Sequence, residues 1–180
     1  MKTSPRLRAI NAVVSALLLV TFVVHGAIGA LEMYGVVEGM SAGVTHTLEL
    51  LAFIHLGIGV YLTIAGLKAQ RKSGGEAYAG ENLRYLLVRI SGIAIAVLMI
   101  AHILSFVHDD ALHSFSIAHL VINALLVASI AVHVVLNVKP LAMSLGIPTK
   151  GSRVVVIALA AALLFMLAAF AVQFLRAGVV

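Results

Sequence analysis

Long apolar runs alternate with short polar segments along the whole chain of 180 residues. Five of these runs are long enough to cross the hydrocarbon core of a bilayer, which is about 30 Å thick and needs roughly 20 residues of helix. They cover residues 10–34, 44–67, 86–107, 115–138 and 153–175. The pattern predicts an all-α integral membrane protein whose residues 1–180 form a single transmembrane domain with five helices.

The composition agrees with this prediction. Hydrophobic residues make up 62% of the chain and charged residues only 11%, whereas about a quarter of a soluble domain is charged. The first run follows the basic stretch MKTSPRLR and ends in AIGA, as a secretory signal peptide would. Its apolar part is longer than a usual signal sequence, so we interpret it as a transmembrane helix.

Charged residues separate to the two sides of the predicted helices. Eleven of the twelve Lys and Arg residues precede the first helix or lie between the second and third or the fourth and fifth. The other side holds Glu32, Glu38, Glu49, Asp109, Asp110 and Arg176. Cytoplasmic loops carry the excess of basic residues, which predicts a multi-pass protein of the cell inner (cytoplasmic) membrane with its N-terminus inside and its C-terminus outside. The formal net charge of +5 is then a topology signal and not a sign of nucleic-acid binding.

Four of the predicted helices carry a histidine within an apolar stretch. These residues are His25, His55, His102 and His133. An ionisable side chain deep in a bilayer usually faces the interior of the helix bundle and marks a functional site. For one lone histidine, a hydrogen bond between helices is an equally good explanation. Four histidines on four helices favour a role as ligands.

The histidines fall into two hairpins, which the polar loop AQRKSGGEAYAGENLR separates. His55 follows His25 by 30 residues, and His133 follows His102 by 31. The fifth helix has neither a histidine nor an internal charge. This repeat predicts a four-helix bundle built from two hairpins, with one extra C-terminal helix that packs against it or faces lipid.

Haem b is the cofactor that best explains these histidines. The chain has no cysteine, which excludes covalently attached c-type haem and a Cys-ligated iron–sulfur cluster. A proton relay would need carboxylates at the same depth, and a structural zinc ion would need four converging ligands. A b-type haem needs only two histidines on facing helices at equal depth. We therefore predict histidine-ligated haem iron, with two haems or one.

The depth of each histidine in the bilayer indicates which two could bind the outer haem but leaves the inner pair of ligands open. His25 and His102 each lie seven residues, or about 10 Å, inward of an acidic residue, which predicts an outer haem. His55 lies 13 residues from the nearest inner basic residue but His133 only six, so an inner pair is allowed but not required. His119 precedes His133 by fourteen residues, on the same face of one helix. It is the alternative ligand.

Three stretches resemble the membrane anchors of succinate dehydrogenases. YLLVRISGIAIAV and AVHVVLNVKPLAMSLG are similar to the first and second helices of the larger anchor, and FIHLGIGVYLTIAGLK to the second helix of the smaller one. The matching positions are Arg89, Ser91 and Gly92 in the first stretch, His133 and Lys139 in the second, and His55, Ile58 and Gly59 in the third. The chain resembles both anchors fused, as in the single-chain, dihaem cytochrome b of succinate dehydrogenase/fumarate reductase complexes.

This resemblance implies an inner haem held by His55 and His133 and an outer haem held by His25 and His102. It also implies that the chain carries electrons between a quinone and partner subunits on the cytoplasmic side. The quinone would be menaquinone or ubiquinone, and the partners a flavoprotein and an iron–sulfur subunit. Alone, the chain would not catalyse succinate or fumarate chemistry. A dimer of complexes is compatible with this picture.

Five further residues are candidates for quinone or haem contacts. Arg89, Ser91 and Lys139 lie at the inner boundary, where they could bind a quinone oxygen or a haem propionate through hydrogen bonds. Basic side chains there also extend to lipid headgroups, and serines often bond back along their own helix. Glu32 and Glu49 are candidate outer acceptors of quinol protons, or else helix-end carboxylates in water.

Departures from the family pattern keep two other classes open. The family's quinone-site serine falls at Tyr85, its nearby tyrosine at Leu67 and a histidine beside the arginine at Val88. The histidine-free helix is the last one, whereas the known two-haem chains have it in the middle. One alternative is the cytochrome subunit of a formate dehydrogenase or hydrogenase, which also uses the spacing of His119 and His133. The other is a haem-free transporter or assembly protein.

Overall fold

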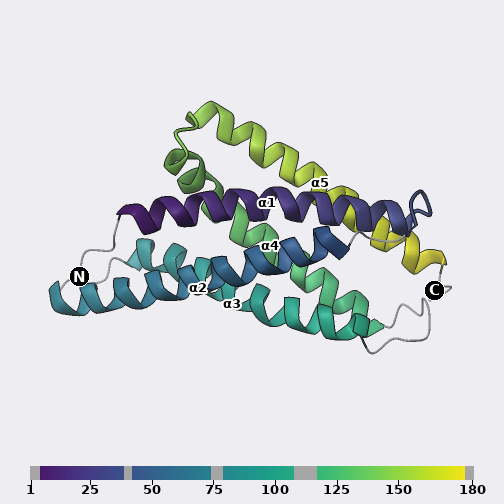
Figure 1. The fold of residues 1–180 in the computed structure, drawn as a ribbon, viewed down its shortest axis with the longest axis horizontal. Helices are drawn as coiled ribbons and strands as arrows, with labels where there is room; N and C mark the ends of the chain where they lie inside the picture. Colours follow the sequence, from purple (N-terminus) through teal and green to yellow (C-terminus); the bar gives the residue numbers. More distant parts are fainter. Residues whose placement is uncertain (1–4, 39–41, 74–78, 108–116, 177–180) are drawn as a thin grey trace.

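The structure, a computed structural model, describes residues 5–38, 42–73, 79–107 and 117–176. These residues form five α-helices and no strand: α1 (Pro5–Met33), α2 (Ala42–Ser73), α3 (Ala79–Val107), α4 (Ile117–Ser144) and α5 (Thr149–Arg176). Successive helices run in opposite directions, and the two termini lie at opposite ends of the molecule (Figure 1). All five helices are long and apolar enough to cross a membrane. The predicted all-α membrane architecture is confirmed.

The helices extend beyond the apolar runs mainly at the end of the molecule where the basic residues lie. α1 begins five residues before the predicted start, α2 ends six residues after the predicted end, and α3 begins seven residues early. An apolar run marks only the part of a helix that lipid can surround. Beyond it the chain is rich in Ala, Lys, Arg, Glu and Leu, which favour helix in water, so the helices continue past the boundary.

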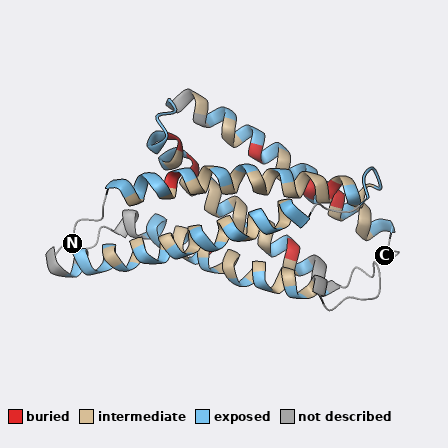
Figure 2. Cartoon of the chain, in the orientation of Figure 1, coloured by how far each residue is buried: buried red, intermediate tan, exposed pale blue. Residues whose placement is uncertain are grey.

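The helices bury few side chains against one another. α1 packs against α2, α4 and α5, while α4 packs against α3 and α5. The buried apolar residues are mostly small or lie where α5 meets its neighbours: Ala12, Ala30, Val138, Ala142, Leu159, Met166 and Ala169. In Figure 2 they are a few isolated positions among residues of intermediate or full exposure. Large side chains such as Ile157, which is 70% exposed, face outward, as expected where lipid replaces water.

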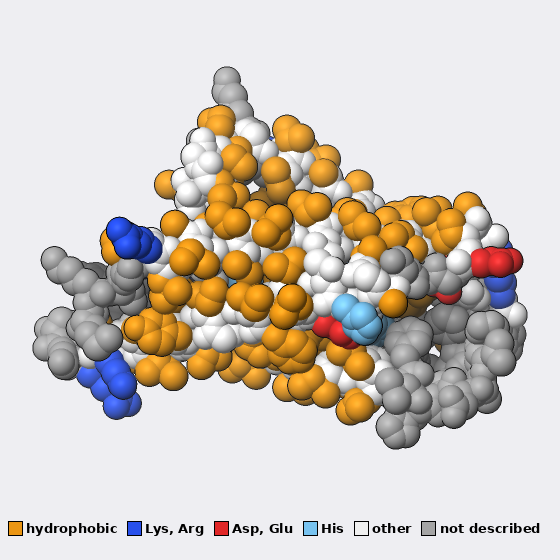
Figure 3. All heavy atoms as spheres, viewed as in Figure 1, with side chains coloured by type: hydrophobic (Ala, Val, Ile, Leu, Met, Phe, Trp, Pro, Cys, Tyr) orange, Lys and Arg blue, Asp and Glu red, His pale blue; other side chains and the backbone are white. Residues whose placement is uncertain are grey.

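Charged side chains gather at the two ends of an apolar surface (Figure 3). Lys and Arg side chains lie at the end where α1 and α3 begin, whereas acidic side chains, together with some basic atoms, lie toward the opposite end. Between them the surface is largely hydrophobic. This is the distribution expected of a multi-pass membrane protein whose N-terminus lies on the side rich in basic residues.

The far end of α1 is tied to α5. The turn after the helix is made by Gly35, whose φ of 76° lies in the left-handed region that glycine adopts without strain. The carbonyl of Met33, in the last turn of α1, has no partner within the helix. It accepts hydrogen bonds from Gln173 Nε2 at 3.0 Å and from Arg176 Nη1 at 3.2 Å. α5 is thus fixed to the bundle by polar contacts as well as by packing.

α4 continues through Pro140 and ends at Ser144. Proline has no N–H, so it leaves the carbonyl four residues earlier, that of Leu136, without its usual helical donor. Arg84 of α3 supplies a replacement, because its Nη2 donates to the Leu136 carbonyl at 2.7 Å. In membrane helices a proline is tolerated where a neighbouring group satisfies the freed carbonyl in this way.

Arg84→Ala should lower the free energy of unfolding by about 1 kcal/mol, the contribution of a typical hydrogen bond. In a Pro140→Ala background the loss should be smaller, because that substitution restores the helical N–H that bonds to the Leu136 carbonyl. Thermal unfolding of the four proteins in detergent gives the coupling between the two sites. Lys68→Ala, which removes an exposed basic side chain at the same end, is the control. Equal losses from Arg84→Ala in both backgrounds would contradict the compensation.

Candidate functional site

His55 and His133 meet between the two hairpins. His55 lies on α2, which packs along α1, and His133 lies on α4, which packs along α3. Their ring centroids are 6.3 Å apart, and the ring planes are inclined at 86°. These are the two histidines that the sequence predicts as the inner pair. A contact between helices of different hairpins therefore joins residues that are 78 positions apart in the chain.

Ser15 of α1 determines which nitrogen of His55 carries the proton. The Ser15 hydroxyl donates its single proton to the Asn11 carbonyl at 2.6 Å. The 3.1 Å contact between Ser15 Oγ and His55 Nδ1 can then be a hydrogen bond only if Nδ1–H is the donor. This network assigns the proton of a neutral His55 to Nδ1 and leaves the lone pair on Nε2.

His133 is held in the same tautomer by α3. Its Nδ1 lies 3.2 Å from the Val88 carbonyl oxygen and 3.1 Å from Ser91 Oγ. A carbonyl oxygen can only accept a hydrogen bond, so Nδ1 must carry the proton. The Ser91 hydroxyl also lies 3.1 Å from the Val88 carbonyl, to which it donates. Nε2 of His133 is therefore the nitrogen that retains a lone pair.

Gly92 of α3 lies beside the His133 ring. A Cβ atom at position 92 would lie 3.4 Å from His133 Cε1 and 3.7 Å from its Nδ1. The neighbouring Ser91 is among the few buried polar residues of the chain. One turn further along α4, Asn137 Nδ2 donates to the His133 carbonyl at 2.7 Å. The contacts of the imidazole itself thus come from Val88, Ser91 and Gly92 of α3.

The three inner residues predicted to contact quinone or propionate have different surroundings. Arg89 lies over the ring of Tyr85, with Cζ 3.0 Å from the ring centroid, as in a cation–π contact. Arg89 Nε is buried and has no hydrogen-bond partner within the described parts of the chain. Lys139 is exposed. Ser91 hydrogen-bonds back along its own helix and with His133. Its observed contacts therefore orient the histidine.

The outer histidines are arranged differently. Of the two predicted pairs, only the inner one forms a ring contact within the described residues. His25 Nδ1 is buried and has no hydrogen-bond partner among those residues. His102 lies on α3, and its backbone carbonyl accepts a hydrogen bond from Ser105 Oγ at 2.7 Å. His119 belongs to α4, as the fourteen-residue spacing requires, but its side chain lies outside what the structure describes.

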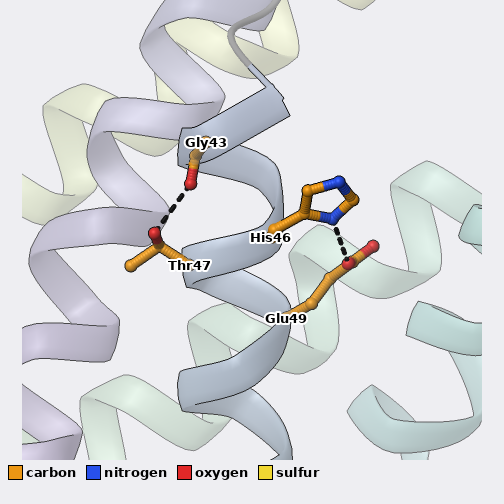
Figure 4. Close-up of polar contacts among 4 residues, drawn as sticks. All are labelled: Gly43, His46, Thr47 and Glu49. Atoms are coloured by element: carbon orange, nitrogen blue, oxygen red, sulfur yellow. Dashed lines mark hydrogen bonds and ion pairs between the residues drawn. The ribbon is translucent and has the colours of Figure 1, made fainter.

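The candidate outer proton acceptors, Glu32 and Glu49, also differ from each other. Glu32 is exposed at the end of α1. Glu49 is partly buried, and its Oε2 lies 3.1 Å from Nδ1 of the exposed His46, one turn earlier on α2 (Figure 4). It is also near enough to His25 for its negative charge to act on that imidazole. Glu49 is therefore the acidic side chain associated with His25 and His46.

The spacing of the inner pair matches that of two imidazoles on opposite sides of a metal. An imidazole nitrogen binds a transition metal such as zinc at about 2.0–2.1 Å, which would hold the two ring centres roughly 6 Å apart. An edge-to-face aromatic pair has a similar spacing, so distance alone does not distinguish the two. The tautomers agree with metal ligation, because a ligating histidine typically donates its other N–H to a hydroxyl, carbonyl or carboxylate. Both rings meet that condition.

The number of protein ligands fits haem iron better than a bare metal ion. Within residues 5–38, 42–73, 79–107 and 117–176, no three or more His, Asp or Glu side chains converge on one point. A structural zinc ion takes four protein ligands, and two histidines cannot complete its coordination. The macrocycle of haem supplies the remaining ligands, so a pair of imidazoles suffices.

Sequence reasoning missed Ser15 and the Val88 carbonyl. Ser15 precedes His25 by ten residues, and Ser91 precedes His102 by eleven. In each hairpin a serine on the outgoing helix therefore contacts the histidine on the returning helix. This extension of the internal repeat is the signal that could have revealed Ser15. The carbonyl of Val88 leaves no mark in the sequence.

Comparisons with models of protein families, with curated proteins and with solved structures find no match for this chain. The functional conclusion therefore depends on the residues of the site and on the three short motifs that surround it.

Nitrogen-15 NMR of the histidine-labelled protein in bilayers should find His55 and His133 protonated on Nδ1 and unprotonated on Nε2, because their neighbours on α1 and α3 accept from Nδ1. Single His→Gln variants assign the signals. The exposed His46 is the internal comparison, since it exchanges with water. Protonation on Nε2 in either inner histidine would contradict the assigned network.

Proposed function

We propose that this chain is a b-type cytochrome, the membrane-anchor subunit that carries electrons between the quinone pool and cytoplasmic flavin and iron–sulfur subunits of a succinate dehydrogenase/fumarate reductase-like complex. The observation that carries the proposal is the His55–His133 pair. The two rings come from different hairpins, lie at the spacing of axial ligands and both keep Nε2 free of its proton. Two axial ligands need all three features, whereas an edge-to-face pair without a metal needs only the spacing.

Residues that carry the resemblance to the anchor subunits gather around this pair. Ser91 and Gly92 of the Arg-x-Ser-Gly motif touch the His133 ring, although about forty residues separate the motif from His133. His55, from the third motif, completes the pair. Two of the resembling stretches thus supply the facing imidazoles, and the third supports one of them. Convergence of this kind favours one shared function over three chance similarities.

A bound haem supplies reversible one-electron chemistry and would be held by Nε2 of His55 and of His133. The chain provides the orientation of both ligands through groups on α1 and α3. It also provides Arg89, whose buried Nε lacks an acceptor in the described structure. A haem propionate or a quinone oxygen would satisfy that donor through a charge-assisted hydrogen bond. His25 and His102 remain the proposed ligands of a second, outer haem.

The purified chain should bind about two protohaems per polypeptide, each held by two histidines. His55→Ala and His133→Ala should each remove the same inner haem, because one missing imidazole leaves the iron without an axial ligand. A pyridine haemochrome assay gives the haem content, and reduced-minus-oxidised spectra identify the component lost. His46→Ala, which removes an exposed histidine near the beginning of α2, should keep the full haem content.

The haem count separates the alternatives. One haem per chain, lost in both inner variants, would keep the inner site and make His25 and His102 structural. A colourless protein from cells with ample haem would refute the cytochrome proposal and favour a haem-free transporter or assembly protein.

The size of the side chain at position 92 should control the inner site. Gly92→Ala should retain both haems, because its Cβ makes only ordinary contact with the His133 ring. Gly92→Leu should lose the inner haem, since the longer side chain needs the space that the imidazole occupies. Gly66→Leu on α2 is the matched control, because nothing lies within 4 Å of a Cβ at that position. Equal haem content in both leucine variants would show that α3 does not confine His133.

A further inference from the structure

We propose that Ser15 is the positioning residue of the inner site, and that the two histidines proposed as axial ligands have unequal support. Among the described residues, the His55 ring is held by Ser15 alone, whereas the His133 ring is held by Ser91 and also by the Val88 carbonyl. This inference depends on the proposed function for its electrochemical consequence. The unequal support itself depends only on the hydrogen bonds.

The two histidines differ in support because their Nδ1–H groups have different numbers of hydrogen-bond acceptors. His133 has two, Ser91 Oγ at 3.1 Å and the Val88 carbonyl oxygen at 3.2 Å. Loss of the Ser91 hydroxyl leaves a backbone acceptor that no side-chain substitution removes. Within the part of the chain that the structure describes, His55 has one acceptor, Ser15 Oγ at 3.1 Å. Loss of that hydroxyl leaves the Nδ1–H of a largely buried ring without a partner, so the ring is free to rotate or to change tautomer.

Ser15 is also the stronger acceptor of the two hydroxyls. Its own proton is committed to the Asn11 carbonyl at 2.6 Å, a short hydrogen bond, whereas the corresponding bond from Ser91 to Val88 is 3.1 Å. A hydroxyl that donates strongly becomes a better acceptor, because hydrogen bonds in a chain polarise one another. The chain of bonds from His55 through Ser15 to the α1 backbone therefore draws the Nδ1 proton away from the ring.

An imidazole whose Nδ1–H is strongly hydrogen-bonded donates more charge through Nε2 to a bound metal. That donation favours the oxidised form of haem iron and lowers the reduction potential. Ser15 thereby tunes the inner haem as well as orienting its ligand. The two serines lie 40 and 42 residues before their histidines, so they occupy equivalent places in the two hairpins, yet only one of them is indispensable.

The test compares Ser15→Ala, Ser91→Ala and Ser15→Thr with the unchanged chain. Redox titration follows the haem component that His55→Ala removes. Ser15→Ala should raise its midpoint potential, with about a tenfold change in the oxidised-to-reduced ratio at fixed potential, or about 59 mV for one electron. Ser91→Ala should shift it less. Ser15→Thr retains the hydroxyl and should restore the original potential.

Thr21→Val is the matched control. Thr21 also lies on α1 and donates to the carbonyl one turn earlier, that of Leu17, at 2.8 Å, but this hydrogen bond is exposed. Its loss should leave the potential unchanged. A Ser15→Ala potential equal to that of Thr21→Val, or a larger shift in Ser91→Ala, would overturn the proposal.

A second measurement separates this inference from the proposed function. In nitrogen-15 NMR of the haem-free chain, Ser15→Ala should reduce the Nδ1-protonated population of His55, while Ser91→Ala leaves that of His133 in place. If the unchanged chain binds no haem, the cytochrome proposal fails but this comparison still decides the positioning role. If the chain binds haem and neither histidine responds, only the positioning role fails.

Discussion

The hydrocarbon core of a membrane holds no water, so every polar group within it must find its partner in the protein. This constraint accounts for the main polar contacts of the chain. The Leu136 carbonyl, freed by Pro140, takes its hydrogen bond from Arg84. The imidazoles of His55 and His133 have hydroxyl and carbonyl acceptors on the helices beside them. Each contact joins two helices, and together they fix how neighbouring helices face one another where apolar packing alone is weakly specific.

Much of the fold could be predicted from the sequence, because length and hydropathy alone determine which segments cross a bilayer. The helix ends were placed less well, since a helix continues into water wherever its residues allow. The inner histidines could be predicted as candidate ligands from their apolar surroundings in the sequence. Ser15 could not, because serine is common in membrane helices and its contact with His55 depends on the rotation of α1 against α2. Such rotation is set by packing over the whole helix pair.

The two histidine pairs show why depth is an incomplete guide. Counting residues from the charged boundaries matched His25 with His102 and left the inner pair uncertain, yet only His55 and His133 form a ring contact in the described structure. Counting assumes parallel helices, whereas α4 runs obliquely to α1 (Figure 1) and remains helical past Pro140. α1 packs along α2, α4 and α5, so α3, which carries His102, is not among its main neighbours.

The Arg84–Leu136 bond has a consequence for how the protein is made. Because α3 is synthesised before α4, the guanidinium that compensates for Pro140 is already in place when the interrupted helix leaves the insertion machinery. α4 alone would enter lipid with an unsatisfied carbonyl near its C-terminal end, so it gains by entering together with α3 as a preformed hairpin. Because α3 precedes α4 in the chain, Arg84 is available to satisfy the Leu136 carbonyl. Inserted by itself, α4 would carry the energetic cost of that unsatisfied carbonyl.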